Sequence, residues 1–248
     1  MQFVSDLHVH TIASTHAYST VTENAAQAAK VGLKLMAVSD HAMSAPDSPH
    51  IWHHFNLKVI PRYLSGVFIV RGIEANLADY EGGLDIDQGL IDELDWVIAS
   101  YHVPCCTPGN ELQHTNSYIK ALETKGVNCL GHTDDSRYPY EVRTVCRACH
   151  DLGKAMELNV ARIIPNGSRA EWAAEVQSFY RKMLSICAEE KTNIVVNSDA
   201  HFCSAIGDFK EAEKLIEEVN FPHELVLNLD EDRIKSFIVN QRNRNIFD

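Results

Sequence analysis

Two histidines separated by one residue, His8 and His10, begin the part of the sequence that could bind a metal ion. In a β-strand, residues two apart point to the same side, so a strand over residues 3–10 would place Asp6, His8 and His10 on one face. His16 follows shortly afterwards. Because the chain has 13 histidines, one such pair is weak evidence alone. The interpretation depends on whether further ligands occupy equivalent positions.

Similar side chains recur where later β-like segments end. The apolar segments 33–39, 67–73, 96–101, 127–131 and 194–197 are each followed closely by His, Asp or Glu. Residues with purely structural roles have no reason to fall at successive strand ends, so we expect a metal site made of nitrogen and oxygen donors. The nine expected ligands are His8, His10, His16, His41, Glu74, His102, His132, Asp199 and His201.

The number of donors predicts the number of ions. One zinc ion takes roughly four ligands, which leaves most of this set unused. Three ions with three or four protein ligands each use all of them if Glu74 or Asp199 bridges. We therefore expect three divalent metal ions, zinc first, with manganese and iron as alternatives because nitrogen and oxygen donors suit all three.

Helical segments separate the β-like segments. Residues 23–31 after a Thr22 cap, 115–124, 141–152 and 171–191 have helical signals, and a further β-like segment, 155–158, ends before Asn159. Alternating β and α elements imply parallel strands, whose chemistry collects at their C-terminal ends. An open doubly wound sheet would use only two or three strand ends. We therefore expect residues 1–248 to form one domain, a distorted (βα)7 barrel.

Composition limits the partners. Lys and Arg number 22 against 34 Asp and Glu, a formal net charge of -12 that disfavours binding to nucleic acid. We see neither a signal-like segment nor the roughly 18 uncharged apolar residues of a membrane span, so we expect no membrane partner. Seven cysteines at irregular spacing favour reduced thiols. These features predict a cytoplasmic protein, and they leave its oligomeric state open.

The sequence resembles the PHP (polymerase and histidinol phosphatase) superfamily in an ordered set of motifs that covers nearly the whole chain. These motifs are His8-x-His10, His16, Asp40-His41, Glu74, His102, His132 and Asp199-x-His201. The fuller strings are similar to those of the small stand-alone bacterial phosphatases of that superfamily. They read Asp6-Leu7-His8-Val9-His10-Thr11, Ser39-Asp40-His41 and Arg71-Gly72-Ile73-Glu74-Ala75-Asn76.

This resemblance implies a distorted (βα)7 barrel whose trinuclear site hydrolyses phosphate esters. It also implies a division of the ligands among the three ions. One ion has His8, His10, Glu74 and Asp199, a second has Glu74, His102 and His132, and a third has His16, His41 and His201. The chain departs from the usual pattern at Thr133-Asp134-Asp135, where Pro-Gly often follows the histidine equivalent to His132. The departure affects the shape of that loop and hence the choice of substrate.

Three divalent ions outweigh the charges of Glu74 and Asp199, so the expected ligand is an anion. Metal ions lower the pKa of bound water, which makes a metal-bound hydroxide the expected nucleophile and requires no further catalytic side chain. We expect a phosphoesterase that acts on a small phosphorylated metabolite. Two alternatives stay open, a 3′-5′ exonuclease or phosphodiesterase acting on nucleic acid and a non-catalytic metal-binding regulatory module.

Five further residues are candidates for supporting roles. Asp6 and Asp40 could orient ligand histidines through the second ring nitrogen, although a role as a helix or loop cap is an equal alternative. Arg162 and Arg169 could bind phosphate oxygens, and solvation at the surface is their alternative. His53, in a histidine-rich loop, is expected to contact the substrate at the entrance of the site.

Overall fold

Parallel strands form the centre of the computed structural model, which describes residues 1–165 and 167–247. Each strand pairs in parallel with the next. In spatial order they are β1 (Ser5–Asp6), β2 (Leu35–Val38), β4 (Val67–Asn76), β5 (Trp96–Ser100), β6 (Cys129–Leu130), β7 (Ala155–Asn159) and β8 (Asn193–Asn197). A short strand, β3 (Tyr63–Leu64), pairs antiparallel with β4 outside this series. The expected distorted (βα)7 barrel is confirmed as a nearly closed barrel of seven parallel strands.

The side chain of Asn228 bridges the seam between β1 and β8. Its Nδ2 donates hydrogen bonds to the carbonyl oxygens of Ser5, at 3.0 Å, and Val196, at 2.6 Å. Its Oδ1 accepts a hydrogen bond from the amide of Val196 at 3.1 Å. Further along, a single parallel bridge joins Val9 to Ala200. The amide side chain thus pairs backbone groups that a strand ladder would otherwise pair.

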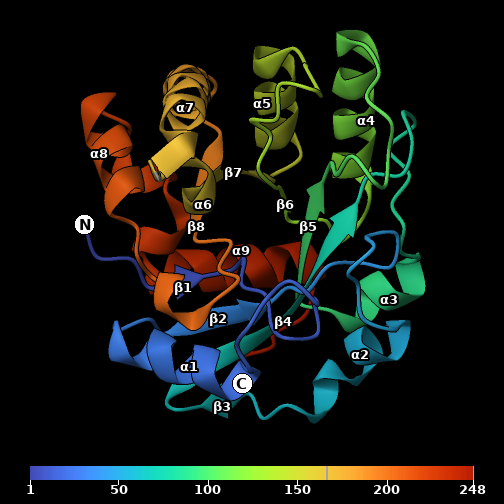
Figure 1. Cartoon of the computed structure of the whole chain (residues 1–248), viewed down its shortest axis with the longest axis vertical. Helices are drawn as coiled ribbons and strands as arrows, with labels where there is room; N and C mark the ends of the chain where they lie inside the picture. Colours follow the sequence, from blue (N-terminus) through green and yellow to red (C-terminus); the bar gives the residue numbers. More distant parts are fainter. Residues whose placement is uncertain (166, 248) are drawn as a thin grey trace.

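Helices surround the barrel (Figure 1). They are α1 (Val21–Lys30), α2 (Ile51–Phe55), α3 (Gln88–Glu93), α4 (Glu111–Glu123), α5 (Val142–Asp151), α6 (Val160–Ile163), α7 (Ala170–Glu190) and α8 (Lys210–Glu218). The cap of the first helix is Thr20 and not Thr22, because Thr20 and Glu23 form a reciprocal capping box. In the part of the chain that the structure describes, no helix has the length and apolar character needed to cross a membrane.

A last helix, α9 (Glu231–Arg242), closes the N-terminal end of the barrel. Its residues Ile234, Phe237 and Ile238 pack in one buried cluster with inward side chains of the strands, among them Phe68 and Trp96. Figure 1 shows α9 in the middle of the molecule, while the other helices lie around the strands. The interior is therefore apolar at this end, which leaves the C-terminal ends of the strands for polar side chains.

The first strand is shorter than the segment 3–10 that the alternation predicts. It covers only Ser5–Asp6. Beyond it, Leu7 packs in the cluster inside the barrel and Val9 in the other cluster, although residues two apart in a strand point to the same side, so the regular alternation ends here. The amide of Leu7 donates to Asn197 Oδ1 and that of Val9 donates to Ser39 Oγ. Side chains take the place of neighbouring backbone, and this is why the regular strand ends early.

Candidate metal centre

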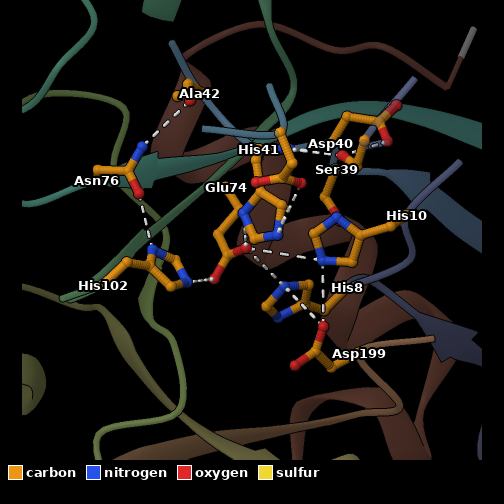
Figure 2. A network of polar contacts seen from close by, with 12 residues as sticks. His8, His10, Ser39, Asp40, His41, Ala42, Glu74, Asn76, His102 and Asp199 are labelled. Carbon is orange, nitrogen blue, oxygen red and sulfur yellow. Dashed lines mark hydrogen bonds and ion pairs between the residues drawn. The ribbon is translucent and has the colours of Figure 1, made fainter. Parts of the chain in front are cut away.

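Glu74 lies at the centre of a group of histidines at the C-terminal end of the barrel (Figure 2). Its Oε1 is 2.7 Å from His132 Nε2 and 3.3 Å from His102 Nε2. Its Oε2 is 2.8 Å from His41 Nδ1 and 3.4 Å from His8 Nε2. The side chain of Glu74 points into the barrel because it lies on the same face of β4 as Phe68 and Val70. These two residues pack in the buried cluster that also contains residues of α9. One carboxylate is thus shared by histidines from several strand ends.

Asp199 is the second carboxylate among the predicted ligands. Its Oδ1 is 3.1 Å from His10 Nε2 and 3.5 Å from His8 Nε2, and His201 Nδ1 lies 3.6 Å away. Its Oδ2 accepts a hydrogen bond from Asn159 Nδ2 at 3.1 Å. Asp199 therefore connects the residues after β8 with those after β1 and β7.

The remaining histidines continue the group toward solvent. The ring of His16 lies 4.3 Å from that of His201 and 5.4 Å from that of His41, measured between centroids. His16 is 53% exposed, whereas His8 and His10 are fully buried. The structure therefore brings all nine sequence-predicted residues together, with His16 at the rim and His8 at the base.

The donor atoms form several sets compact enough to hold an ion. Each set offers three donors that lie within 4.8 Å of one another, and some residues belong to more than one set. The sets are His8, His10 and Glu74; His41, Glu74 and His102; His10, His41 and His201; and His16, His41 and Asp47. The first is part of the expected group for one ion. The last includes Asp47, which the sequence pattern does not single out.

Unpaired atoms in the site fit the binding of cations. Nε2 of His8 and Nε2 of His201 are both buried, and neither has a hydrogen-bond partner among the described residues. Buried polar atoms are normally paired in native proteins. A divalent ion accepts a lone pair from imidazole nitrogen or carboxylate oxygen, and this set offers both. The residues present therefore fit divalent metal ions.

Two of these residues have left-handed backbone, which non-glycine residues rarely adopt. The φ angle is +25° at His132 and +53° at Asp199. Such conformations cost of order 1 kcal/mol or more and cluster at functional sites. Each is the second residue after a strand, β6 or β8, where the chain must turn inward to direct a side chain at the site. The strain is consistent with a role in binding.

Charges in the site shift the pKa values of its groups strongly. Burial raises the pKa of Glu74, but the nearby His102, His8 and His41 lower it by a larger amount. The pKa of Glu74 is therefore well below its usual range. Burial lowers the pKa of His8, but Glu157, Asp199 and Glu74 raise it well above the usual value. Burial alone dominates at His10 and lowers its pKa to about 4. The carboxylates are therefore ionised and attract cations.

Three supporting residues were not predicted from the sequence. Glu157 Oε1 accepts a hydrogen bond from His8 Nδ1 at 2.8 Å, Asn76 Oδ1 from His102 Nδ1 at 2.7 Å, and Asp47 Oδ2 from His16 Nδ1 at 2.7 Å. Each contact occupies one ring nitrogen and turns the other toward the site. For Glu157 a signal exists in the sequence, since an acid inside an apolar strand is seldom buried without a partner.

Asp6 and Asp40 make different contacts from the ones expected. Asp6 accepts hydrogen bonds from the amides of Ser198 and Gly207, and burial raises its pKa to about 6. Asp40 accepts from the amide and hydroxyl of Thr11, among others. Among the described residues, neither carboxylate bonds to one of the seven histidines in the predicted ligand set. Both hold the loops that carry the histidines.

His53 is also placed differently. Its Nε2 lies 2.9 Å from Asp40 Oδ2. This hydrogen bond directs the ring toward Asp40 and away from the space between the nine predicted ligands. The substrate contact expected of His53 therefore does not appear in this geometry. The neighbouring His50 caps α2 by accepting a hydrogen bond from the amide of Trp52.

A cavity of about 490 Å³ opens over the histidines. Its walls include Glu74, His102 and Asp199, and Arg162 lines it as well. Arg162 donates from Nε to Asp134 Oδ2 at 2.9 Å. Arg169 lines a neighbouring cavity instead, so only one of the two expected arginines reaches the metal cavity. Asp134 belongs to the loop that departs from the usual sequence pattern, and this departure provides the partner of Arg162.

Comparison with known proteins gives relatives of similar length. No family model matches the chain. It is 34% identical to a probable phosphatase of Clostridium novyi (strain NT) over 238 residues, which is 96% of this chain and 95% of the relative. It is 37% identical to a probable phosphatase of Caldanaerobacter subterraneus subsp. tengcongensis over 245 residues, which is 98% of this chain and 94% of the relative.

The fold is also similar to a solved structure. The crystal structure of histidinol phosphate phosphatase from Lactococcus lactis subsp. lactis, complexed with zinc, L-histidinol and phosphate, aligns with a TM-score of 0.59. The alignment covers 88% of this chain and 94% of that chain at 17% sequence identity. At this level of identity the likeness supports the barrel fold.

Proposed function

This chain belongs to the family of bacterial phosphatases that includes the proteins of Clostridium novyi and Caldanaerobacter subterraneus, and we propose that its substrate is a phosphomonoester of a small metabolite. The protein is a metal-dependent phosphatase, a hydrolase of phosphoric esters. We assign it to the PHP superfamily, with chemistry like that of histidinol phosphatase at a centre of three divalent ions, zinc first. The nine predicted ligands are proposed as the residues that hold these ions.

The observation that carries this proposal is the position of Glu74. Its two oxygens lie within 3.4 Å of nitrogen atoms of four histidines, at the base of a cavity of about 490 Å³. A cavity of this size accommodates a small molecule. Cations bound around Glu74 would make its base positive inside an acidic protein, and a phosphate group is an anion suited to such a base.

The protein positions the reacting groups. When bound, divalent ions lower the pKa of a water molecule and draw negative charge from phosphoryl oxygens. Glu157 and Asn76 hold Nδ1 of His8 and His102, so that Nε2 of each ring faces Glu74. Arg162 is fixed on Asp134 through Nε and Nη2, both 2.9 Å from Oδ2, which leaves Nη1 to donate to a phosphate oxygen.

The test measures inorganic phosphate released from a panel of phosphomonoesters, and the alcohol or nucleotide products released from phosphodiesters and single-stranded DNA, with zinc, manganese or iron added. We expect the monoesters to be cleaved fastest, and activity to disappear after treatment with a chelator. His10→Ala and Asp199→Ala should lose at least about 100-fold in kcat. His150→Ala is the matched control, since this exposed histidine bonds only to the carbonyl oxygen of Lys191 among the described residues.

Circular dichroism must show that each variant is folded. Full activity in metal-free protein would contradict metal dependence. Faster digestion of single-stranded DNA than of any monoester would replace the proposed substrate class with nucleic acid.

A further inference from the structure

A second cavity adjoins the metal cavity and contains three arginines. Its volume is about 400 Å³, and its lining consists of Asp135, Ser136, Arg137, Arg162, Arg169 and Trp172. Asp135, Arg137 and Arg162 also line the metal cavity. The two cavities therefore adjoin and share these three side chains. We refer to the second as the arginine cavity.

Carboxylates hold two of the three arginines. Arg137 donates from Nε to Asp135 Oδ1 at 2.9 Å and from Nη2 to Asp135 Oδ2 at 2.6 Å. Arg162 donates from Nε and Nη2 to one oxygen, Asp134 Oδ2. The guanidinium carbon of Arg162 lies 4.7 Å from the ring centroid of Trp172, and that of Arg169 lies 5.9 Å from it. Because carboxylates orient the guanidinium groups of Arg137 and Arg162, binding to these two groups requires little further ordering.

The charge of the arginine cavity favours an anion. Arg137, Arg162 and Arg169 bring three positive charges, and Asp134 and Asp135 balance two of them when ionised. Among the described residues, Arg169 has no carboxylate partner within ion-pair distance. Three of the chain's 22 Lys and Arg line this one cavity. Guanidinium groups bind phosphate and carboxylate groups through paired N–H donors.

We propose that the substrate carries a second anionic group, phosphate or carboxylate, which binds in the arginine cavity while the scissile phosphate occupies the metal cavity. This inference rests on the proposed phosphatase function. Arg169 and Arg137 bind the second group, and Ser136 adds a hydroxyl donor. Contact with an unreacting part of the substrate stabilises ground state and transition state equally, so its loss raises KM more than it lowers kcat.

The test compares substrates that differ only in the second anionic group. Glucose 1-phosphate is the reference, glucuronic acid 1-phosphate carries a carboxylate at C6, and glucose 1,6-bisphosphate carries a second phosphate at C6. We expect kcat/KM to be at least about 10-fold higher for one of the doubly anionic compounds than for the reference, the size of one charge-assisted contact. The compound with the larger preference identifies which anion the cavity takes.

Variants then assign the preference to residues. In Arg169→Gln, the ratio of kcat/KM between the preferred compound and the reference should fall about 10-fold, mainly through KM. Arg169→Lys keeps the charge and should restore part of the ratio. Arg181→Gln is the matched control, because Arg181 lies on the same helix as Trp172 but pairs with Glu218 at the surface. It should leave the ratio unchanged.

Three outcomes separate the two proposals. Activity on all three sugars with ratios near one in the wild type would overturn the second-anion site and leave the phosphatase function intact. A high ratio that Arg169→Gln and Arg137→Gln both leave unchanged would also overturn it. Failure to release phosphate from any monoester in metal-loaded protein would overturn the proposed function, and the second-anion site with it.

Discussion

Glu157 accepts a hydrogen bond from Nδ1 of His8 at 2.8 Å, and this contact decides that Nε2 of His8 faces Glu74. Its other oxygen accepts from the amide of His132 at 2.8 Å. One buried carboxylate from the middle of β7 therefore orients two of the proposed ligand residues. Burial raises the pKa of Glu157, but contacts led by that with His8 lower it by a larger amount, so the group is ionised.

Replacement of this carboxylate tests its role. In Glu157→Gln, the side chain keeps its shape but loses the charge and one acceptor, so either His8 or the amide of His132 loses its partner. We expect zinc affinity to fall about 10- to 100-fold, as for other partners of metal-bound histidines. Competition with a chromogenic chelator measures it.

Glu190→Gln is the control for this change, because Glu190 pairs with Arg143 and Arg147 at the surface. It removes the same charge far from the site and should leave zinc affinity unaltered. A folded Glu157→Gln variant with wild-type zinc affinity would rule out the orienting role.

The rim position of His16 leads to a second prediction. Because His16 is 53% exposed, His16→Ala removes a proposed ligand without opening a buried cavity. We expect the wild type to retain three divalent ions per chain and the variant two, while its thermal midpoint in the metal-free state is unchanged. Elemental analysis by mass spectrometry after gel filtration counts the ions. An equal count in both proteins would remove His16 from the ligand set.

The seam at Asn228 predicts a large effect on stability. Asn228→Leu has a similar volume but leaves the carbonyl oxygens of Ser5 and Val196 and the amide of Val196 without the side-chain partner. Each unpaired buried group costs about 1–3 kcal/mol, so we expect the free energy of unfolding to fall by at least about 3 kcal/mol. Urea denaturation measures it. Asn240→Leu, on the exposed face of α9, serves as the control, and equal losses in both variants would contradict the role of the seam.

Lys154 gives the stability a specific dependence on pH. Its Nζ donates to the carbonyl oxygen of Val127 and to Gln241 Oε1, and burial lowers its pKa from 10.5 to about 8. Between these two values the unfolded chain binds more protons than the folded protein, so stability rises with pH. Relative to Lys154→Met, the free energy of unfolding of the wild type should increase by up to about 3 kcal/mol from pH 8 to pH 10.5.

The measurement is the difference between the two unfolding curves at each pH, in which the titration of cysteines and tyrosines cancels. A difference that stays constant over this range, or that falls as pH rises, would show that Lys154 keeps its ordinary pKa in the folded protein.

The nine proposed ligands could be predicted because their residue types are unusual at the ends of apolar segments, and strand ends in a parallel barrel meet at one place. The barrel itself followed from the same alternation. Glu74 lies on the regular strand β4, and His102 follows the regular strand β5. Both residues illustrate this relationship. Local pattern is sufficient where secondary structure is regular.

Partners across the barrel could not be predicted in this way. Whether His8 bonds to Asp6, two residues away, or to Glu157, on the opposite side of the seam, depends on how the first and last strands meet. Asp47 lies in an irregular loop, where no period gives the direction of a side chain. Sequence spacing therefore predicted which side chains gather at the strand ends, and only the folded chain determined which groups hold them.

The same seam has a consequence for the order of events during synthesis. His8 and His10 leave the ribosome early, whereas Asp199, His201 and Asn228 are among the late residues. Contacts between parts so distant in sequence form slowly and only after most of the chain is available. The strand order therefore delays completion of the site until the chain is almost complete, and a truncated or stalled chain lacks Asp199 and His201.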